Sequence, residues 1–168
     1  MYAEAIVEHH TYTARGGHGE PKPWIIDSGC SAHFSPNQSE FIAYTPYASP
    51  HQIHLGGSRA ISLMGEGTMS LVCLIDGKLF THLIHSVQYV PDLSYTLLSC
   101  CTLTHHGLTT TFKDDGCKIY HKDGVVIAES SQMPNQLYFL NVVKRRVETM
   151  PDNNAALTAA PLFDLAHK

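Results

Sequence analysis

The chain has 168 residues, of which 43% are hydrophobic, and its 11 basic and 15 acidic residues give a formal net charge of −4. This length fits one domain with modest extensions and is enough to bury a core without disulfides or a metal. The acidic balance argues against a general nucleic-acid or membrane-binding surface, because surfaces that bind phosphate are usually basic. The one basic cluster, Lys144-Arg145-Arg146, is interpreted as part of a solvated linker.

The cysteines are odd in number and include no C-x-x-C pair. We interpret them as reduced thiols that mostly fill the core, which is typical of a cytoplasmic protein. The N-terminus has no apolar run of the signal-peptide type, and no stretch approaches the length of a membrane span. We therefore expect a cytoplasmic chain without a membrane partner. The five cysteines are Cys30, Cys73, Cys100, Cys101 and Cys117.

Residues 1–22 contain several glycines and are predicted to be a leader or linker. From residue 23 to residue 143, short apolar runs alternate with turn residues. Three Asp-Gly pairs, which begin at Asp76, Asp115 and Asp123, separate β-prone runs and predict hairpin turns. Many short strands at nearly regular spacing indicate an all-β sandwich or barrel.

One helix is predicted over residues 99–106, and Gly107 would end it. The pair Pro36-Asn37 is a start signal for a second short helix around residues 37–42. Residues 144–160 are polar and then rich in alanine, and they are predicted to form a linker. Residues 162–168 resemble the opening turn of another helix.

The apolar run Trp24-Ile25-Ile26 leads directly into Asp27-Ser28-Gly29. This order suits an acid protease, because a strand fixes the carboxylate, the hydroxyl can brace the loop, and glycine lets another chain approach closely. Two carboxyl groups in contact share a proton, so that one serves as general base for water and the other as general acid. For these three residues alone, an ordinary turn after a strand remains the alternative interpretation.

Five segments resemble, in chain order, the protease region of Ty1/copia-type retrotransposon Pol polyproteins. The ordered series is much more specific than Asp-Ser-Gly by itself. Residues 161–168 are similar to the start of the pre-integrase segment of these polyproteins, in which His167 would match the first histidine of a zinc-binding module. The five segments are WIIDSGCS (24–31), IHLGGS (53–58), MGEGT (64–68), VQYVPDL (87–93) and LLS (97–99).

The resemblance implies an all-β fold over residues 23–143, a retropepsin-like closed β-barrel with one short helix and polar linkers at both ends. It implies an aspartic endopeptidase that needs no cofactor and cleaves extended peptide junctions of its polyprotein. Ser99 stands where retropepsins have glycine, and its Cβ would make a strained turn there harder to form. The implied site consists of catalytic Asp27, Ser28 and Gly29 and of substrate-binding Gly65, Gly67, Leu98 and Ser99.

The chain contains a single Asp-Ser-Gly, and the other Asp-Gly pairs are better explained as turns. A second catalytic carboxylate would therefore come from a second copy, in a homodimer with two-fold symmetry. The segment from Ile53 to Gly67 would supply a flap-like hairpin over the cleft. The rival hypothesis is a catalytically inactive, retrotransposon-derived β-barrel interaction module, since a fold alone does not grant a function.

Twelve histidines give no metal site that the sequence can define. The pairs His51/His54 and His82/His85 are three residues apart, and in a strand such side chains point to opposite faces. His33 follows Asp27 by six residues and could line the cleft, but the sequence assigns it no role. We expect no metal and no nucleic-acid partner for this segment.

Overall fold

The computed structural model describes residues 23–54, 60–134, 136–143 and 163–164. Within these ranges the chain is mostly strand, with one short α-helix, so the all-β prediction is confirmed. The predicted leader and linker, residues 1–22 and 144–160, lie outside the described residues. The strands are β1 (Trp24–Asp27), β2 (Phe34–Ser35), β3 (Phe41–His54), β4 (Ala60–Ile75), β5 (Lys78–Tyr89), β6 (Thr96–Ser99), β7 (Thr109–Lys113), β8 (Gly116–Tyr120), β9 (Val126–Gln132), β10 (Tyr138–Leu140) and β11 (Phe163–Asp164).

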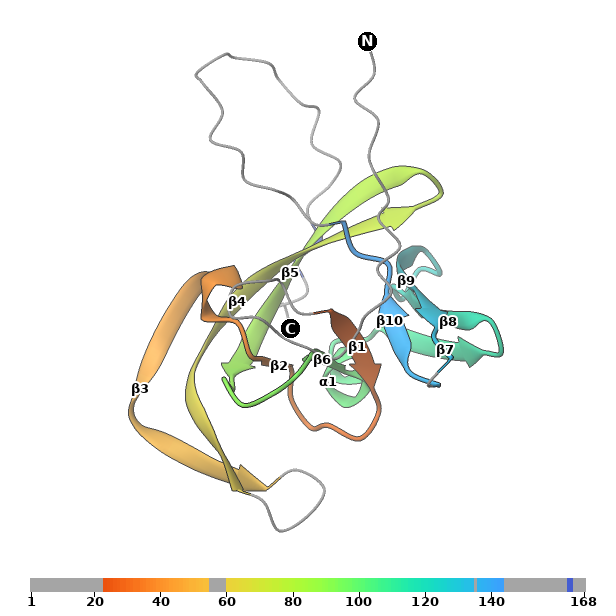
Figure 1. Cartoon of the computed structure of the whole chain (residues 1–168). Helices are drawn as coiled ribbons and strands as arrows, with labels where there is room; N and C mark the ends of the chain where they lie inside the picture. Colours follow the sequence, from red (N-terminus) through yellow and green to blue (C-terminus); the bar gives the residue numbers. More distant parts are fainter. Residues whose placement is uncertain (1–22, 55–59, 135, 144–162, 165–168) are drawn as a thin grey trace, which may run out of the picture.

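The strands form one sheet in the order β3-β4-β5-β2-β6-β1-β10-β9-β8-β7, and β11 pairs with β5 outside this path. Most neighbours are antiparallel, but the pairs β1–β6, β2–β5 and β5–β11 are parallel. The sheet curls, so that β4 also contacts β9 across the interior (Figure 1). The domain is therefore of the β-barrel type, and its strand order in the described residues is open, with β3 and β7 at the two ends.

The Asp-Gly pairs form turns, as predicted. Asp76 and Gly77 connect β4 and β5 with φ angles of 48° and 73°, the left-handed pair that a tight two-residue hairpin requires. Gly124, with φ 84°, lies in the turn between β8 and β9. The turn between β7 and β8 falls on Asp114 and Asp115, between the paired ends of the two strands.

The predicted helix is confirmed as α1 (Cys100–His105), which begins after the N-cap Ser99 and ends before Gly107, whose φ is 78°. The weaker start signal at Asn37 produces only a single 3-10 turn, η1 (Gln38–Glu40). The helical turn expected at 162–168 is wrong for its two described residues, because Phe163–Asp164 is a strand paired with β5. No helix of the described residues is long and apolar enough to cross a membrane.

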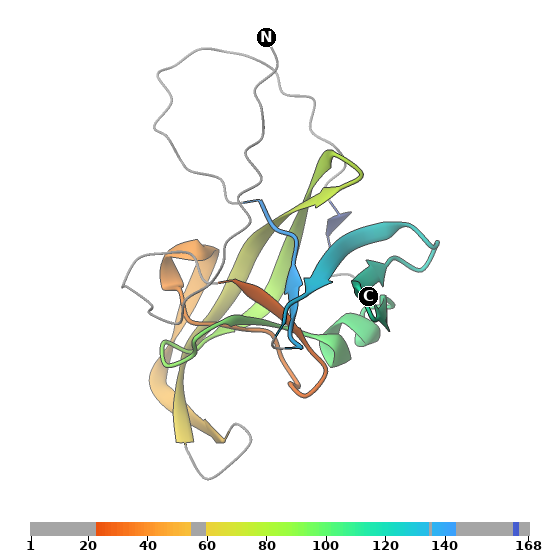
Figure 2. The ribbon, with the colours of Figure 1, turned by 45° about the vertical axis from the view of Figure 1, so that its right-hand side comes forward.

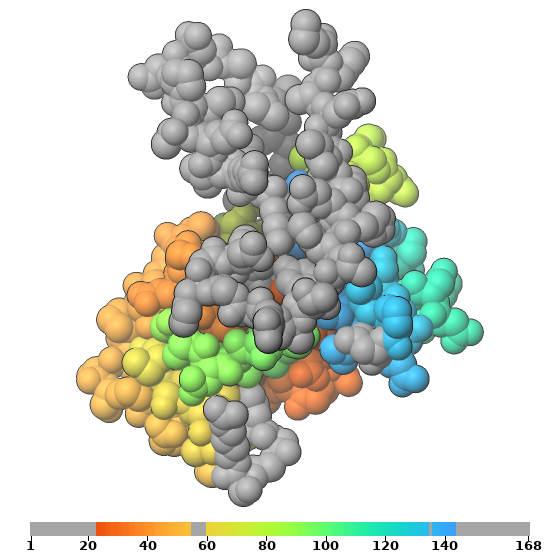
Figure 3. Space-filling view, viewed as in Figure 1, coloured from red at the N-terminus to blue at the C-terminus, as the bar shows by residue number. Residues whose placement is uncertain are grey.

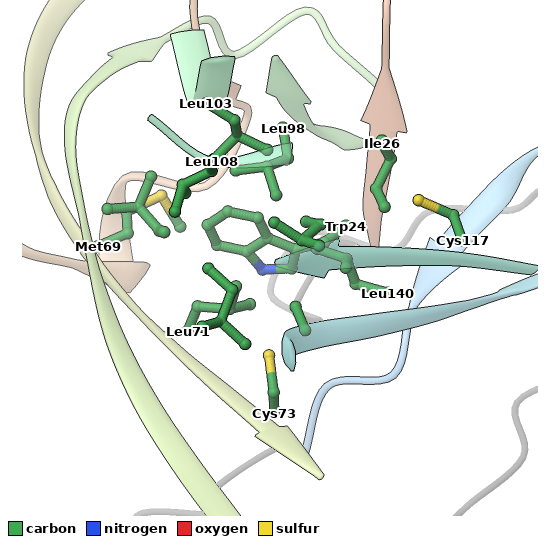
Figure 4. Close-up of a cluster of buried hydrophobic side chains, with 14 of the residues drawn as sticks. Trp24, Ile26, Met69, Leu71, Cys73, Leu98, Leu103, Leu108, Cys117 and Leu140 are labelled. Atoms are coloured by element: carbon green, nitrogen blue, oxygen red, sulfur yellow. The ribbon is translucent and has the colours of Figure 1, made fainter. Parts of the chain in front are cut away.

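The main hydrophobic core surrounds Trp24, which is 5% exposed (Figure 4). Its buried side chains come from β1, β4, β5, β6, β8, β9, β10 and α1, together with Leu108. Full burial of one large apolar side chain stabilises a fold by about 1.5–3 kcal/mol. All five cysteines are free thiols, and Cys30, Cys73 and Cys117 are buried, which confirms their role as core residues.

A second, smaller cluster joins the long β3–β4 hairpin to the loop that follows β1. It contains Cys30 and Phe34 from the loop and β2, Ile61 and Leu63 from β4, and Val90 after β5. The hairpin end at which His54 pairs with Ala60 lies on the same side of the molecule as this loop (Figures 1 and 2). The hairpin expected from the sequence is therefore present and is anchored beside Asp27-Ser28-Gly29.

Candidate active site

Asp27 is the last residue of β1, a strand in the interior of the sheet. Strand β1 pairs in parallel with β6, in a register that sets Asp27 opposite Ser99, and β10 covers its other edge through Ile25 and Phe139. The three apolar residues before Asp27 are each 5% exposed. The position of the Asp27 backbone is thus fixed by two neighbouring strands and by the core.

The residues after Asp27 form an exposed loop. The Asp27 carboxylate accepts a hydrogen bond at Oδ1 from the Gly29 N–H, at 2.7 Å, whereas Oδ2 has no hydrogen-bond partner among the described residues. A Cβ at Gly29 would lie 3.2 Å from Oδ1, closer than a relaxed contact. Asp27 is half-buried, Ser28 and Gly29 are exposed, and the loop reaches the molecular surface (Figure 3). One carboxylate oxygen is held in place while the other can meet a further group.

Ser99 ties this loop to α1. Its hydroxyl donates to the Cys30 carbonyl oxygen at 2.7 Å and accepts from the Thr102 N–H at 3.1 Å, as the N-cap of the helix. Ser99 is fully buried and its bond to Cys30 is shielded from water, whereas the bond from the Thr102 N–H is partly buried. Its φ and ψ of −71° and 118° lie in the ordinary extended region. The strain expected from a serine in place of glycine is therefore absent, and the hydroxyl has a clear structural use.

Two thiols lie close to the Asp27 carboxylate. Burial, together with the negative charge of Asp27, raises the pKa of Cys30 to about 12. Burial also raises the pKa of Cys100, with a smaller contribution from Asp27. Because only a thiolate is a good nucleophile, these cysteines are protonated neighbours of Asp27 and not reactive groups.

His33, six residues after Asp27, also bonds to Ser99. Its Nδ1 accepts a hydrogen bond from the Ser99 N–H at 3.0 Å, and the residue is 4% exposed. Burial, with a smaller contribution from His106, lowers the pKa of His33 to about 4. The ring is therefore neutral at neutral pH, with Nδ1 as acceptor and the proton on Nε2.

The low pKa of His33 predicts a loss of stability in acid. The unfolded chain takes up a proton on this histidine near pH 6.5, whereas the folded chain does so only near pH 4, so stability present above pH 6.5 is lost as the pH falls towards 4. The expected loss is about 3 kcal/mol, and burial of His82, whose pKa is also lowered, adds to it. Urea unfolding at pH values across this interval measures the effect.

His33→Asn tests the contribution of this residue, because the Asn Oδ1 can replace Nδ1 as acceptor and does not titrate. Its unfolding free energy should change less between pH 6.5 and pH 4 than that of the wild type. His54→Asn, at an exposed end of β3, is the matched control and should keep the wild-type dependence. If the unfolding free energy of His33→Asn depends on pH as steeply as that of the wild type, His33 is not the source of the acid sensitivity.

The remaining predicted site residues have packing roles in the structure. A Cβ at Gly65 would lie 2.5 Å from the Thr45 carbonyl oxygen, and one at Gly67 would clash with that of Ala43. Both glycines let β3 approach its antiparallel neighbour β4 closely. Leu98 is 1% exposed and lies in the core directly before Ser99. Contact of Gly65, Gly67, Leu98 and Ser99 with a substrate stays a prediction, and residues 55–59 lie outside the described part.

The structure thus brings Asp27, Ser28, Gly29 and Ser99 together. Sequence reasoning left His33 without a role and did not identify Cys30 and Thr102 as partners of Ser99. No local pattern marks His33 or Cys30, because their contacts with Ser99 join residues 66 and 69 positions apart. Thr102 lies only three residues after Ser99, and its role follows from the usual chemistry of a serine N-cap. Within the described ranges, no group of three His, Cys, Asp or Glu side chains is arranged to hold a metal ion.

These observations define the class of protein: it is an all-β domain with a carboxylate at the end of an interior strand. The family model described as "Pol polyprotein, beta-barrel domain" matches residues 24–108, and the chain belongs to this family. A putative transposon Ty5-1 protein of Saccharomyces cerevisiae is 35% identical over 77 residues, which are 45% of this chain and 46% of that protein. No solved structure matches. The resemblance to a Ty1/copia-type retrotransposon Pol region is confirmed.

Proposed function

We propose that this chain is one subunit of a homodimeric aspartic endopeptidase that cleaves extended peptide junctions of a retrotransposon polyprotein. The observation that carries the proposal is the placement of Asp27 at the end of a strand held on both edges, with Oδ1 bound by Gly29 and Oδ2 open. The exposed Ser28 and Gly29 beside it leave room for a second chain and for a peptide.

In the proposed mechanism, two copies of the Asp27 loop meet across a two-fold axis. Two carboxyl groups in contact bind one proton between them, because both cannot ionise cheaply at such a distance. The ionised carboxylate removes a proton from a water molecule that attacks the peptide carbonyl carbon. The protonated carboxyl group donates to the reacting carbonyl oxygen, and the peptide nitrogen takes up a proton as its bond to carbon breaks.

The substrate is proposed to lie between the Asp27 loop and the β3–β4 hairpin. The second cluster anchors this hairpin to the loop through Ile61, Leu63 and Cys30, which sets the two elements on the same side of the domain. An extended peptide can pair its backbone with exposed strand edges, and β3 is the end strand of the sheet in the described residues. Side-chain pockets between the two elements would then set the cleavage preference.

The test is cleavage of a complex peptide library by the purified 168-residue chain at mildly acidic and neutral pH, read by mass spectrometry. Because the proposed site needs two chains, specific activity should increase with protein concentration until the dimer is saturated. Molar mass measured in the same samples should increase over the same range. Cleavage that is proportional to concentration in a strictly monomeric protein contradicts the paired site.

If no peptide is cleaved over the full concentration range, the result supports the rival hypothesis of an inactive interaction module, whether the protein dimerises or remains monomeric. Contaminating proteases are the main risk in such an assay. The Asp27→Asn protein, prepared by the same procedure, therefore serves as the blank, and only products absent from that blank count as cleavage by this chain.

A further inference from the structure

A pocket of about 250 Å³ lies beside the support of the Asp27 loop, between β5, α1 and the segment that carries His33. Its volume is just below the roughly 300 Å³ at which sites for drug-sized ligands begin, so it suits a molecule of amino-acid size. Three imidazoles, those of His33, His85 and His106, line it together with three apolar side chains, those of Ile84, Leu103 and Leu108.

His33 offers a hydrogen-bond donor to this pocket. Its Nδ1 is occupied by the Ser99 N–H, so the neutral ring carries its proton on Nε2. The residue is 4% exposed and lines the pocket, and Nε2 has no hydrogen-bond partner among the described residues. Nε2 is not fully buried, so its N–H is open to the pocket and can donate to the acceptor of a ligand.

A bulge in β5 brings two more polar residues to the pocket. Gly67 pairs with Val87 and Met69 with Ile84, so His85 and Ser86 together stand opposite the single residue Thr68. Ser86 has a φ of 53°, a left-handed conformation that is unfavourable for a residue with a side chain. Bulges that redirect side chains, and strained residues, are found preferentially at functional sites.

The bulge also fixes the orientation of the His85 ring. Its Nδ1 lies 3.0 Å from the Thr68 Oγ1, on the neighbouring strand. His106 follows α1, where its backbone N–H caps the helix and its side chain is exposed at the pocket rim. Among the described residues, no acidic side chain lines the pocket, and its polar part consists of the three imidazoles and the Ser86 hydroxyl.

We propose that the pocket binds a carboxylate that carries a short apolar group, with the His33 Nε2–H as the donor and His106 at the rim. The carboxylate would lie among the imidazoles, and the apolar group would contact Ile84, Leu103 and Leu108. Such a group is found at the C-terminus of a peptide that ends in an aliphatic residue and in a free branched carboxylic acid. The proposal does not depend on Asp27 being catalytic.

Binding can be measured by amide chemical shifts of the full chain, labelled with nitrogen-15 and carrying Asp27→Asn to prevent self-cleavage. The probes are N-acetyl-leucine, which has a carboxylate, and N-acetyl-leucinamide, which has the same shape without the charge. Shifts should concentrate at Leu103, Leu108 and Ile84, and the acid should bind about tenfold more tightly than the amide, as expected for one charge-assisted hydrogen bond. Equal affinity, or shifts elsewhere, overturns the proposal.

His106→Ala should weaken binding of N-acetyl-leucine several-fold, because it removes a rim donor from an exposed position that does not support the core. His105→Ala, at the neighbouring exposed position outside the pocket, should bind as the parent does. The same loss in both variants, or in neither, contradicts the assignment of His106. A long-range nitrogen spectrum that places the His33 proton on Nδ1 also contradicts the proposal, without any variant in His33.

Two further probes separate the sources of the carboxylate. A short peptide that ends in leucine with a free carboxylate and the free acid 4-methylpentanoate are titrated in parallel. Tighter binding of the peptide identifies a chain terminus as the ligand, whereas tighter binding of the free acid identifies a small metabolite. If neither of these probes binds, and N-acetyl-leucine does not bind either, the proposed site is rejected.

Discussion

Asp27→Asn is expected to lower the rate of peptide cleavage on the order of 10³-fold, the contribution that positioned acid–base catalysis typically makes. The Asn Oδ1 can still accept the Gly29 N–H, so the loop should keep its shape. The amide, however, cannot take a proton from water or deliver one to the substrate. The measurement is the initial rate on the best peptide from the library, with the thermal unfolding midpoint recorded for both proteins.

Mixing gives a sharper form of this prediction. If wild-type and Asp27→Asn chains are mixed in equal amounts and exchange freely, about a quarter of the dimers have two carboxylates. At a fixed total protein concentration, activity should therefore fall to about a quarter of the wild-type value, and not to a half. Asp92→Asn, at an exposed turn, is the matched control and should leave activity unchanged alone and in the mixture. A fall to one half would show that each subunit acts alone.

Ser99→Ala is expected to destabilise the fold by about 2–4 kcal/mol. The change removes the N-cap of α1, which binds the Thr102 N–H and is worth about 1 kcal/mol, and it leaves the buried Cys30 carbonyl without the Ser99 hydroxyl, at about 1–3 kcal/mol. It should also loosen the loop that holds Asp27, because the bond from Ser99 to Cys30 is its link to the helix. Urea unfolding measures the loss of stability, and the rate of peptide cleavage shows whether the Asp27 loop keeps its position.

Two comparisons isolate the hydroxyl. Ser70→Ala removes an exposed hydroxyl from β4 and should change stability by less than about 0.5 kcal/mol. Ser99→Gly should be less harmful than Ser99→Ala, because glycine is a better N-cap and leaves space for a water molecule at the Cys30 carbonyl. If Ser99→Ala unfolds at the same urea concentration as the wild type, the bridging role of the hydroxyl is wrong.

The turns and the helix could be predicted because their signals are local. Asp76-Gly77 specifies a hairpin through its left-handed backbone, and Ser99 and Gly107 delimit α1 by the usual chemistry of helix ends. Asp27 could be identified as a candidate because an apolar strand precedes it and the family's blocks follow it. Each of these inferences needed only a few consecutive residues.

The contacts that hold the site could not be predicted in the same way. Two of these features depend on which strands become neighbours. His33 accepts a hydrogen bond from the Ser99 N–H, and Ser86 adopts a left-handed backbone at a bulge. The same holds for Gly65 and Gly67, which the family resemblance implied as substrate-binding residues and which the structure explains by the close approach of β3 to β4. Strand order is set by the whole core, and period-two patterns do not encode it.

The parallel pairing of β1 with β6, closed on the other edge by β10, also has a consequence for the timing of folding. Strand β1 precedes both of its partner strands in the chain, so it cannot take its native place until residues 96–99 and 138–140 have left the ribosome. Contacts this distant in sequence form slowly, and chains fold as domains become complete. Asp27 is therefore held in position only after every strand from β1 to β10 has been synthesised.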